Sequence, residues 1–258
     1  MPEGDTIAYA ARRMRAVLEG HVPEAIRTPQ ARHAMDRWPQ RLGGRAVTGI
    51  RTHGKHLFIR FDGDLTLHSH LRMTGSWAVY EQDMRWRRSP RRAWLVLERA
   101  GHQVVQFDGP VLELLTESRT RFDQRLAGLG PDVLAAQFEP DRFLARLRAD
   151  DPTRGIGDAL LDQRNVAGIG NIWKAEGCWE AGVDPWRPVG EVTDSEAVAI
   201  IDAVRPRMLA SAQTGRMREQ PGVFRRHGRP CPRCGAKIQA RSQGDDNRTT
   251  FWCPRCQR

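Results

Sequence analysis

The sequence predicts an α+β protein that has an N-terminal antiparallel β-sandwich, a helical segment after it and a short cysteine-rich ribbon at the end. Short apolar runs separated by glycine, aspartate and proline turn signals fill residues 46–115, which is the spacing of a sandwich or barrel. After about residue 120 the apolar positions recur at helical spacing. At 258 residues the chain is long enough for a sizeable core and for two domains of ordinary size.

The first element is an expected helix over residues 5–20, which carries one apolar stripe. Asp5 is a suitable cap for its start, and Gly20 is a suitable end. Residues 21–44 are rich in proline and glycine, and we expect an irregular connection there. The expected strands are Ala46–Thr52, His56–Asp62, Leu65–His70, Ser76–Tyr80, Ala93–Leu97, Val104–Phe107 and Val111–Leu115.

Helical patterns dominate the following hundred residues. Between two of the expected helices, Gly168 and Gly170 form a Gly-x-Gly loop. Its backbone amides could approach a phosphate closely, and the dipole of the next helix would add to the attraction. The expected helices are Val133–Gln137, Pro140–Arg148, Gly155–Arg164, 172–181 and Asp194–Ala212.

The net charge of +10 is concentrated at the end of the chain. Residues 205–258 hold 13 basic against 3 acidic side chains, whereas residues 1–204 hold 28 of each. Such a basic segment favours a polyanionic partner, and nucleic acid ranks ahead of membrane because no amphipathic apolar face accompanies the charge. Only three of the 41 basic residues are lysines, namely Lys55, Lys174 and Lys237. No apolar run is long enough for a membrane span and no signal peptide is evident, so we expect a soluble cytoplasmic protein.

The strongest motif is a pair of Cys-x-x-Cys sequences near the C-terminus. Their spacing, C-x2-C-x18-C-x2-C, is typical of a four-thiolate zinc ribbon. Disulfides are the alternative, but paired knuckles in a cytoplasmic chain favour metal. We expect one structural zinc ion per chain, and we expect the fifth cysteine, Cys178, to be a core residue. The expected zinc ligands are Cys231, Cys234, Cys253 and Cys256.

The first residues, Met1-Pro2-Glu3-Gly4-Asp5, could carry catalysis. Removal of Met1 would give Pro2 a free secondary amine, which can condense with an aldehyde-level carbon to form a Schiff base. Glu3 would stand beside it as an acid or base. The alternative is a plain turn that leads into the helix capped by Asp5.

Several motifs in the same order resemble the formamidopyrimidine-DNA glycosylase/endonuclease VIII family, and the Pro-Glu-Gly start is closest to the endonuclease VIII-like (Nei) branch. The resemblance spans nearly the whole chain. It implies an N-terminal β-sandwich, a helix-two-turns-helix domain and a zinc finger. The motifs that carry it are Pro2-Glu3-Gly4, Gly54–Ile59, Leu129–Asp132, Gly168–Asn171 and Arg248–Cys253.

The resemblance also implies an activity. Such an enzyme is a bifunctional DNA glycosylase and AP lyase of base excision repair, and this branch usually removes oxidised pyrimidines. Pro2 resembles the nucleophile that attacks C1′ of the damaged nucleotide, and Glu3 resembles the carboxyl group that assists opening of the sugar ring. Lys55 matches the family's catalytic lysine. The strand would then be cleaved by β- or β,δ-elimination.

Three further residues resemble DNA ligands of the family. Asn171 and Arg248 resemble phosphate ligands of the two-turn motif and of the zinc finger. Met73 lies where the family places a wedge that fills the gap left by a flipped base. The chain departs from the family in two places: Thr6 replaces a second glutamate found in many relatives, and the Asp-Pro-Arg-Arg-Phe-Gly segment of the 8-oxoguanine-directed branch has no counterpart.

The resemblance leads us to expect three domains, over residues 1–120, 121–222 and 223–258. The expected partner is double-stranded DNA that contains damaged bases or abasic sites, with no membrane partner. We expect a monomer that is associated with the nucleoid of a bacterial-type cell and is not secreted. Two alternatives without catalysis remain: a zinc-ribbon protein that binds damaged or branched DNA, and a zinc-ribbon module that binds RNA or protein.

Overall fold

The computed structural model describes residues 2–31, 36–217 and 220–258. The chain divides into two compact units, each described by itself. The first unit contains residues 1–2 and 6–127, and the second contains residues 3–5 and 128–258. The short segment 3–5 therefore clusters with helices that follow it by more than a hundred residues.

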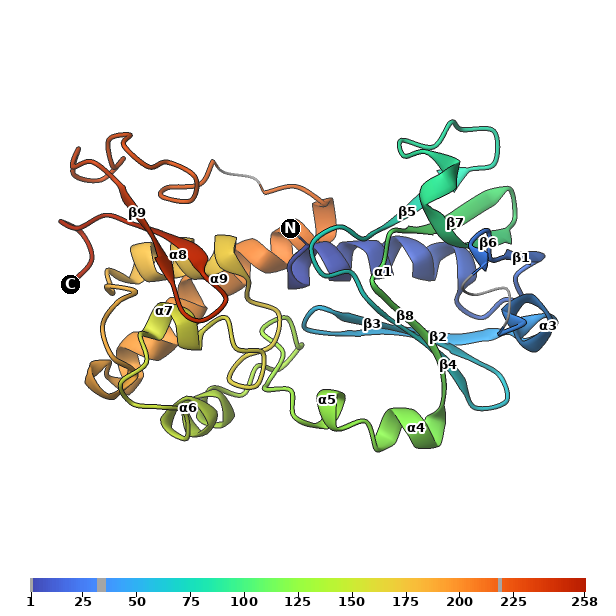
Figure 1. Cartoon of the computed structure of the whole chain (residues 1–258), viewed down its shortest axis with the longest axis horizontal. Coiled ribbons are helices and arrows are strands. Elements are labelled where there is room, and N and C mark those ends of the chain that lie inside the picture. The colour runs from blue at the N-terminus through green and yellow to red at the C-terminus, as the bar shows by residue number, and fades with distance from the viewer. Residues whose placement is uncertain (1, 32–35, 218–219) are drawn as a thin grey trace. The chain divides into compact units, whose positions relative to one another are not determined.

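The first unit is built on two four-stranded antiparallel sheets (Figure 1). In β3 the buried residues alternate with more exposed ones, as expected for a strand with one face on a core. Apolar side chains from both sheets belong to one buried cluster, so the sheets pack face to face and the predicted sandwich is confirmed. One sheet has the order β2 (Val47–His53), β3 (His56–Phe61), β4 (Leu65–His70) and β8 (Val111–Thr116). The other has the order β1 (Ala25–Arg27), β6 (Ala93–Arg99), β7 (His102–Phe107) and β5 (Ser76–Glu81).

Helix α1 (Gly4–Leu18) confirms the expected N-terminal helix. Its apolar stripe is fully buried in the same cluster, with Ile7, Met14 and Leu18 at most 1% exposed. The expectation of an irregular connection over residues 21–44 was wrong in part. That stretch contains β1 and the short helix α3 (Trp38–Leu42). Both are too short for a periodic pattern, and proline is compatible with the first turn of a helix.

The remaining elements of the first unit are short helices. One leads directly into β6, and the other two follow β8. These helices are η1 (Pro90–Arg92), α4 (Glu117–Arg121) and α5 (Gln124–Ala127).

The second unit has a helical core. Its helices are α6 (Pro140–Arg148), α7 (Ile156–Ala159), α8 (Asn171–Ala181), η2 (Val189–Glu191) and α9 (Asp194–Thr214). Helix α8 packs on α9, and a full capping box at Thr193 and Glu196 fixes the start of α9. The expected helices over 140–148, 172–181 and 194–212 are thus confirmed.

Two expected helices in this unit were wrong or too long. Residues 133–137 form turns, because the carbonyls of Val133, Ala135 and Ala136 accept hydrogen bonds from the Arg205 guanidinium instead of helical N–H groups. In the segment 155–164 only α7 is helical. Its last carbonyl, that of Ala159, accepts from the side chain of Asn165.

The last two strands, β9 (Gln239–Gln243) and β10 (Arg248–Trp252), form an antiparallel hairpin that contacts α8 within the second unit. This hairpin lies between the two cysteine pairs, and Lys237 lies just before it. Among the described helices, none combines the length and the apolar character needed to cross a lipid bilayer.

Candidate functional site

The Glu3 carboxylate is buried at the N-terminus of α8. It accepts backbone N–H bonds from Gly170 at 2.9 Å, Ile172 at 2.8 Å and Trp173 at 3.3 Å, and Glu3 is only 1% exposed. These donors and the positive end of the helix dipole stabilise a negative charge. A Cβ at Gly170 would lie 2.3 Å from Cδ of Glu3, so only glycine leaves room for the carboxylate.

This arrangement corrects one prediction about the Gly-x-Gly loop. We expected its amides to be open to a phosphate, but the Gly170 N–H is bound to Glu3 and the Gly168 N–H is bound to Oε1 of Gln163. The Gly-x-Gly sequence is needed for a different reason. Gly168 has φ of +104°, and its backbone lies against Gly4 closely enough to exclude a Cβ there.

Two more contacts fix the segment that carries Glu3. The Gly4 N–H donates to the Gly168 carbonyl at 2.9 Å, and the Ser211 hydroxyl donates to Oδ2 of Asp5 at 2.6 Å. Asp5 is 6% exposed, so its carboxylate is held inside the unit. The alternative of a plain turn before a capped helix is therefore too simple, because three consecutive residues bind partners about 165 to 206 positions away.

Pro2 and Lys55 both belong to the first unit. Pro2 is half-buried and joined to Glu3 by the peptide bond, and Met1 lies outside the described residues. Lys55 is half-buried in the tight turn between β2 and β3, where Gly54 has φ of +55°. Its charge is one cause of the low pKa of His70, after burial and Arg72. Of the predicted site residues, Pro2 and Lys55 therefore belong to the first unit, whereas Glu3, Asn171 and Arg248 belong to the second.

Three histidine side chains lie close together beside the Lys55 turn, and the rings of His56 and His68 are stacked. His56 Nδ1 lies 2.9 Å from Nε2 of His68, whose Nδ1 lies 3.4 Å from the Glu113 carboxylate. The rings of His56 and His70 are 4.6 Å apart. Burial, followed by repulsion from neighbouring cations, lowers the pKa of His56 to about 3 and that of His70 to about 4. These imidazoles are therefore neutral at physiological pH.

Met73, the expected wedge, is exposed on the turn that connects β4 to β5. Its side chain is 56% exposed, which is unusual for a large apolar residue. The turn is braced by Arg88, whose guanidinium donates to the Thr74 carbonyl at 2.9 Å and to Asp108 at 3.1 Å. An exposed apolar side chain on a braced turn fits a wedge that must enter a base stack.

Asn171 and Arg248 are brought together through β10. Nδ2 of Asn171, the first residue of α8, donates to the Thr249 carbonyl at 2.7 Å. Thr249 follows Arg248 in the chain, and the Arg248 guanidinium is 3.6 Å from the Asp246 carboxylate. Both side chains keep partial exposure, so each can still contact a ligand.

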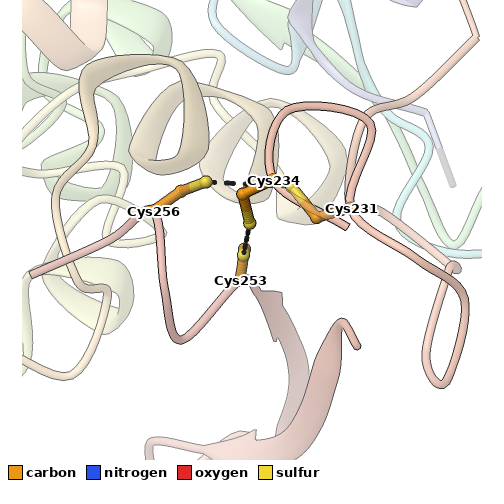
Figure 2. Close-up of side chains that lie close together, drawn as sticks. All are labelled: Cys231, Cys234, Cys253 and Cys256. Atoms are coloured by element: carbon orange, nitrogen blue, oxygen red, sulfur yellow. Dashed lines mark hydrogen bonds between the residues drawn. The ribbon is translucent and has the colours of Figure 1, made fainter. Parts of the chain in front are cut away.

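The four predicted cysteines converge at the end of the second unit (Figure 2). Their sulfur atoms all lie within 4.8 Å of one another, with Cys231 and Cys256 at 3.8 Å and Cys234 and Cys253 at 3.5 Å. A tetrahedron with Zn–S bonds of about 2.3 Å has edges of about 3.8 Å, so the thiols fit one zinc ion. All are free thiols, which removes the disulfide alternative. Cys178 is fully buried in the core, as expected.

Two charged residues of α8 are buried, although no pattern in the sequence indicated it. Lys174 is fully buried and donates to the Thr250 hydroxyl at 2.6 Å. Glu176 is also fully buried, and its carboxylate accepts N–H bonds from Gly222, Val223 and Phe224. The scarcity of lysine pointed to Lys174, but nothing in the sequence showed that its partner would be 76 residues away.

The fold and these sites define a two-unit α+β protein with a four-cysteine zinc finger, and comparison with known families identifies its class. The chain matches the formamidopyrimidine-DNA glycosylase N-terminal domain over residues 1–122, the H2TH domain of that glycosylase over 129–219, and the zinc finger found in FPG and IleRS over 228–258. The chain belongs to the formamidopyrimidine-DNA glycosylase family, which confirms the predicted resemblance and its α+β fold.

Named relatives cover the whole chain. It is 43% identical to "Probable endonuclease 8 2" of Streptomyces coelicolor, over 94% of that protein. It is 38% identical to "DNA-(apurinic or apyrimidinic site) lyase Nei2" of Mycolicibacterium smegmatis, over 99% of that protein. The crystal structure of Lactococcus lactis Fpg with abasic-site DNA superposes with a TM-score of 0.84 at 25% identity, with both chains fully covered. The same L. lactis protein has been crystallised with DNA that contains an oxidised pyrimidine, with a TM-score of 0.84 at 26% identity.

Proposed function

We propose that this DNA glycosylase and AP lyase acts through the amine of Pro2, with Glu3 as its acid–base partner and Lys55 as a supporting cation. The observation that carries the proposal is the Glu3 carboxylate. It is buried, fixed by three N–H donors on α8, and joined directly to the residue that becomes N-terminal when Met1 is removed. A carboxylate held this firmly beside an amine is pre-organised for proton transfer.

The chemistry requires the amine of Pro2 to be unprotonated. Its nitrogen attacks C1′ of the damaged nucleotide, and Glu3 assists ring opening and proton transfer as the base departs. The resulting iminium acidifies the adjacent sugar hydrogens, so elimination breaks the strand at the 3′ side. Water then hydrolyses the C1′–N iminium bond, which releases the sugar as an aldehyde and returns the free amine of Pro2.

We assign binding of the DNA phosphates to Asn171 and Arg248, and we assign Met73 as the wedge that enters the base stack. Asn171 is tied to Thr249, next to Arg248, so both phosphate ligands belong to one supported surface. Met73 carries an exposed apolar side chain suited to occupy the gap of a flipped base. The partner we propose is duplex DNA with a damaged base or an abasic site, bound by a monomer in the cytoplasm at the nucleoid.

Oxidised pyrimidines are the proposed substrates. The Pro-Glu-Gly start and the absent Arg-Arg-Phe segment favour this class over 8-oxoguanine. The division into domains over 1–120, 121–222 and 223–258 is part of the same proposal, and the three family matches support it.

The experiment is a nicking assay on matched duplexes that contain an oxidised pyrimidine, 8-oxoguanine, an abasic site or no damage. We expect excision and cleavage of the oxidised pyrimidine and cleavage of the abasic site. Protein that retains extra residues ahead of Pro2 should be inactive on both. Binding without cleavage by the mature protein would favour a non-catalytic DNA-binding role instead.

A further inference from the structure

Lys174 is a fully buried lysine in the second turn of α8. A buried ammonium is costly unless it is paired and hydrogen-bonded. Its Nζ donates to Oγ1 of Thr250 at 2.6 Å, and the carboxylates of Asp158 and Glu3 act on it through longer-range attraction. Burial nevertheless lowers the pKa of Lys174 to about 8. A methionine or leucine would fill such a core position at lower cost, so the amine has a reason beyond packing.

The contact of Lys174 continues through both strands of the zinc-finger hairpin. The Thr250 hydroxyl, on β10, donates to Oε1 of Gln243 on β9 at 2.7 Å. Nε2 of Gln243 donates in turn to the Pro185 carbonyl at 2.7 Å. Thr250 is fully buried and Gln243 is 7% exposed, so water does not replace these partners. Lys174 thus holds the hairpin on α8, and Gln243 holds the hairpin on the loop at Pro185.

The strand held in this way is the one that carries Arg248. Arg248 is paired with Gln243 in the hairpin register, and Thr249 accepts from Asn171 one turn before Lys174 on α8. Two adjacent residues of β10 are therefore fixed by two residues on successive turns of α8. Lys174 itself is buried and has no surface to offer DNA.

We propose that Lys174 is a positioning residue for DNA binding, which fixes the zinc-finger hairpin on α8 so that Arg248 and Asn171 engage the phosphate backbone together. The inference rests on the proposed phosphate contacts of those two residues. Burying a lysine is costly, and the directional hydrogen bond to Thr250, which an apolar side chain cannot make, gives a reason for that cost.

The test is Lys174→Met, measured as affinity for a duplex with a stable abasic-site analogue over a range of salt concentrations. We expect about tenfold weaker binding and a slope of log affinity against log salt that is smaller by about one, as if one phosphate contact were lost. The zinc content should stay at one per chain. Thr250→Val removes the hydroxyl that accepts from Lys174 and should give the same result. Thr250→Ser retains a hydroxyl and should keep wild-type affinity.

Val204→Ala is the control for destabilisation alone. Val204 on α9 faces Gly177 of α8 and belongs to a buried cluster that contains no residue of the hairpin. Its truncation should therefore lower the melting temperature and leave the salt slope unchanged. The positioning role is overturned if Lys174→Met behaves like Val204→Ala, or if it loses zinc. Should Lys174→Met not fold, Thr250→Val decides by the same criteria.

Arg248→Ala separates the inference from the function on which it rests. If Arg248→Ala weakens binding and reduces the salt slope while Lys174→Met and Thr250→Val do not, only the positioning role fails. If Arg248→Ala changes neither quantity, the proposed phosphate contact fails and the positioning role fails with it.

Discussion

The Glu3 carboxylate accepts the N–H of Gly170 at 2.9 Å, across a sequence separation of 167 residues. The residue next to the proposed nucleophile is thus held by the start of α8 and not by its own helix. The same three-turn helix binds β10 through Asn171 and Lys174. Helix α8 is therefore the element on which both Glu3, the proposed acid–base group, and the zinc-finger hairpin depend.

Glu3→Gln tests the role of the carboxylate. We expect base excision to fall by at least about 100-fold, the scale of general acid–base catalysis, while cleavage of a preformed abasic site is reduced less. The amide also offers one acceptor oxygen to three N–H donors, so the melting temperature should fall as well. Single-turnover assays on both substrates measure the difference. Equal loss on both would argue against a role specific to base departure.

Gly170→Ala tests the fit of Glu3 at the helix terminus. The added Cβ would lie 2.3 Å from Cδ of Glu3 and would displace the carboxylate. We expect loss of base excision comparable to that of Glu3→Gln, with the Pro2 amine intact. Gly49→Ala is the matched control, because its Cβ would have only one neighbour, at 3.9 Å. Unchanged excision by Gly170→Ala would show that the position of Glu3 is not needed.

Removal of zinc tests the four-cysteine site. The thiols would repel one another as thiolates without the ion, and a segment this small cannot form a core alone. Cys234→Ser or a strong chelator should therefore unfold the finger and abolish tight DNA binding. Metal analysis should give one zinc per chain in the wild type. Retained affinity in a zinc-free preparation would contradict the prediction.

The stability of the protein should rise with pH just above pH 8 because of Lys174. Its pKa is about 8 in the folded state against an ordinary value of 10.5, so the unfolded chain binds more protons in this window and unfolding becomes harder as pH rises. The free energy of unfolding should gain up to about 1.4 kcal/mol per pH unit from this group. Denaturant titrations from pH 8 to 9 should show the gain in the wild type and lose it in Lys174→Met.

Cys178 should have the opposite effect at higher pH. Burial raises the pKa of its thiol to about 12 from an ordinary value of 9.0, so the folded state keeps a proton that the unfolded chain releases. Stability should fall between those values, and Cys178→Ala should lessen the fall. A wild-type curve that Cys178→Ala leaves unchanged above pH 9 would contradict this assignment.

The sequence was sufficient to predict elements with a clear period and residues in fixed local motifs. The strands from β2 to β8, helices α1, α6, α8 and α9, and the zinc cysteines all fall in this class. Contacts between segments that are distant in the sequence could not be predicted in this way. Residues 133–137 are not helical, and their carbonyls accept hydrogen bonds from the Arg205 guanidinium. In the Gly-x-Gly loop, the Gly170 N–H donates to Glu3. Neither partner is near in the sequence, and no local propensity indicates it.

Borohydride trapping on an abasic-site duplex tests the central claim most directly. The claim requires the mature protein, with Met1 removed, to form an iminium between Pro2 and C1′, which borohydride reduces to a stable covalent adduct. We predict that mature protein is trapped, that Pro2→Gly keeps part of the trapping through a primary amine, and that protein with residues ahead of Pro2 is not trapped. Equal trapping with and without those residues would contradict the claim and make a lysine such as Lys55 the nucleophile.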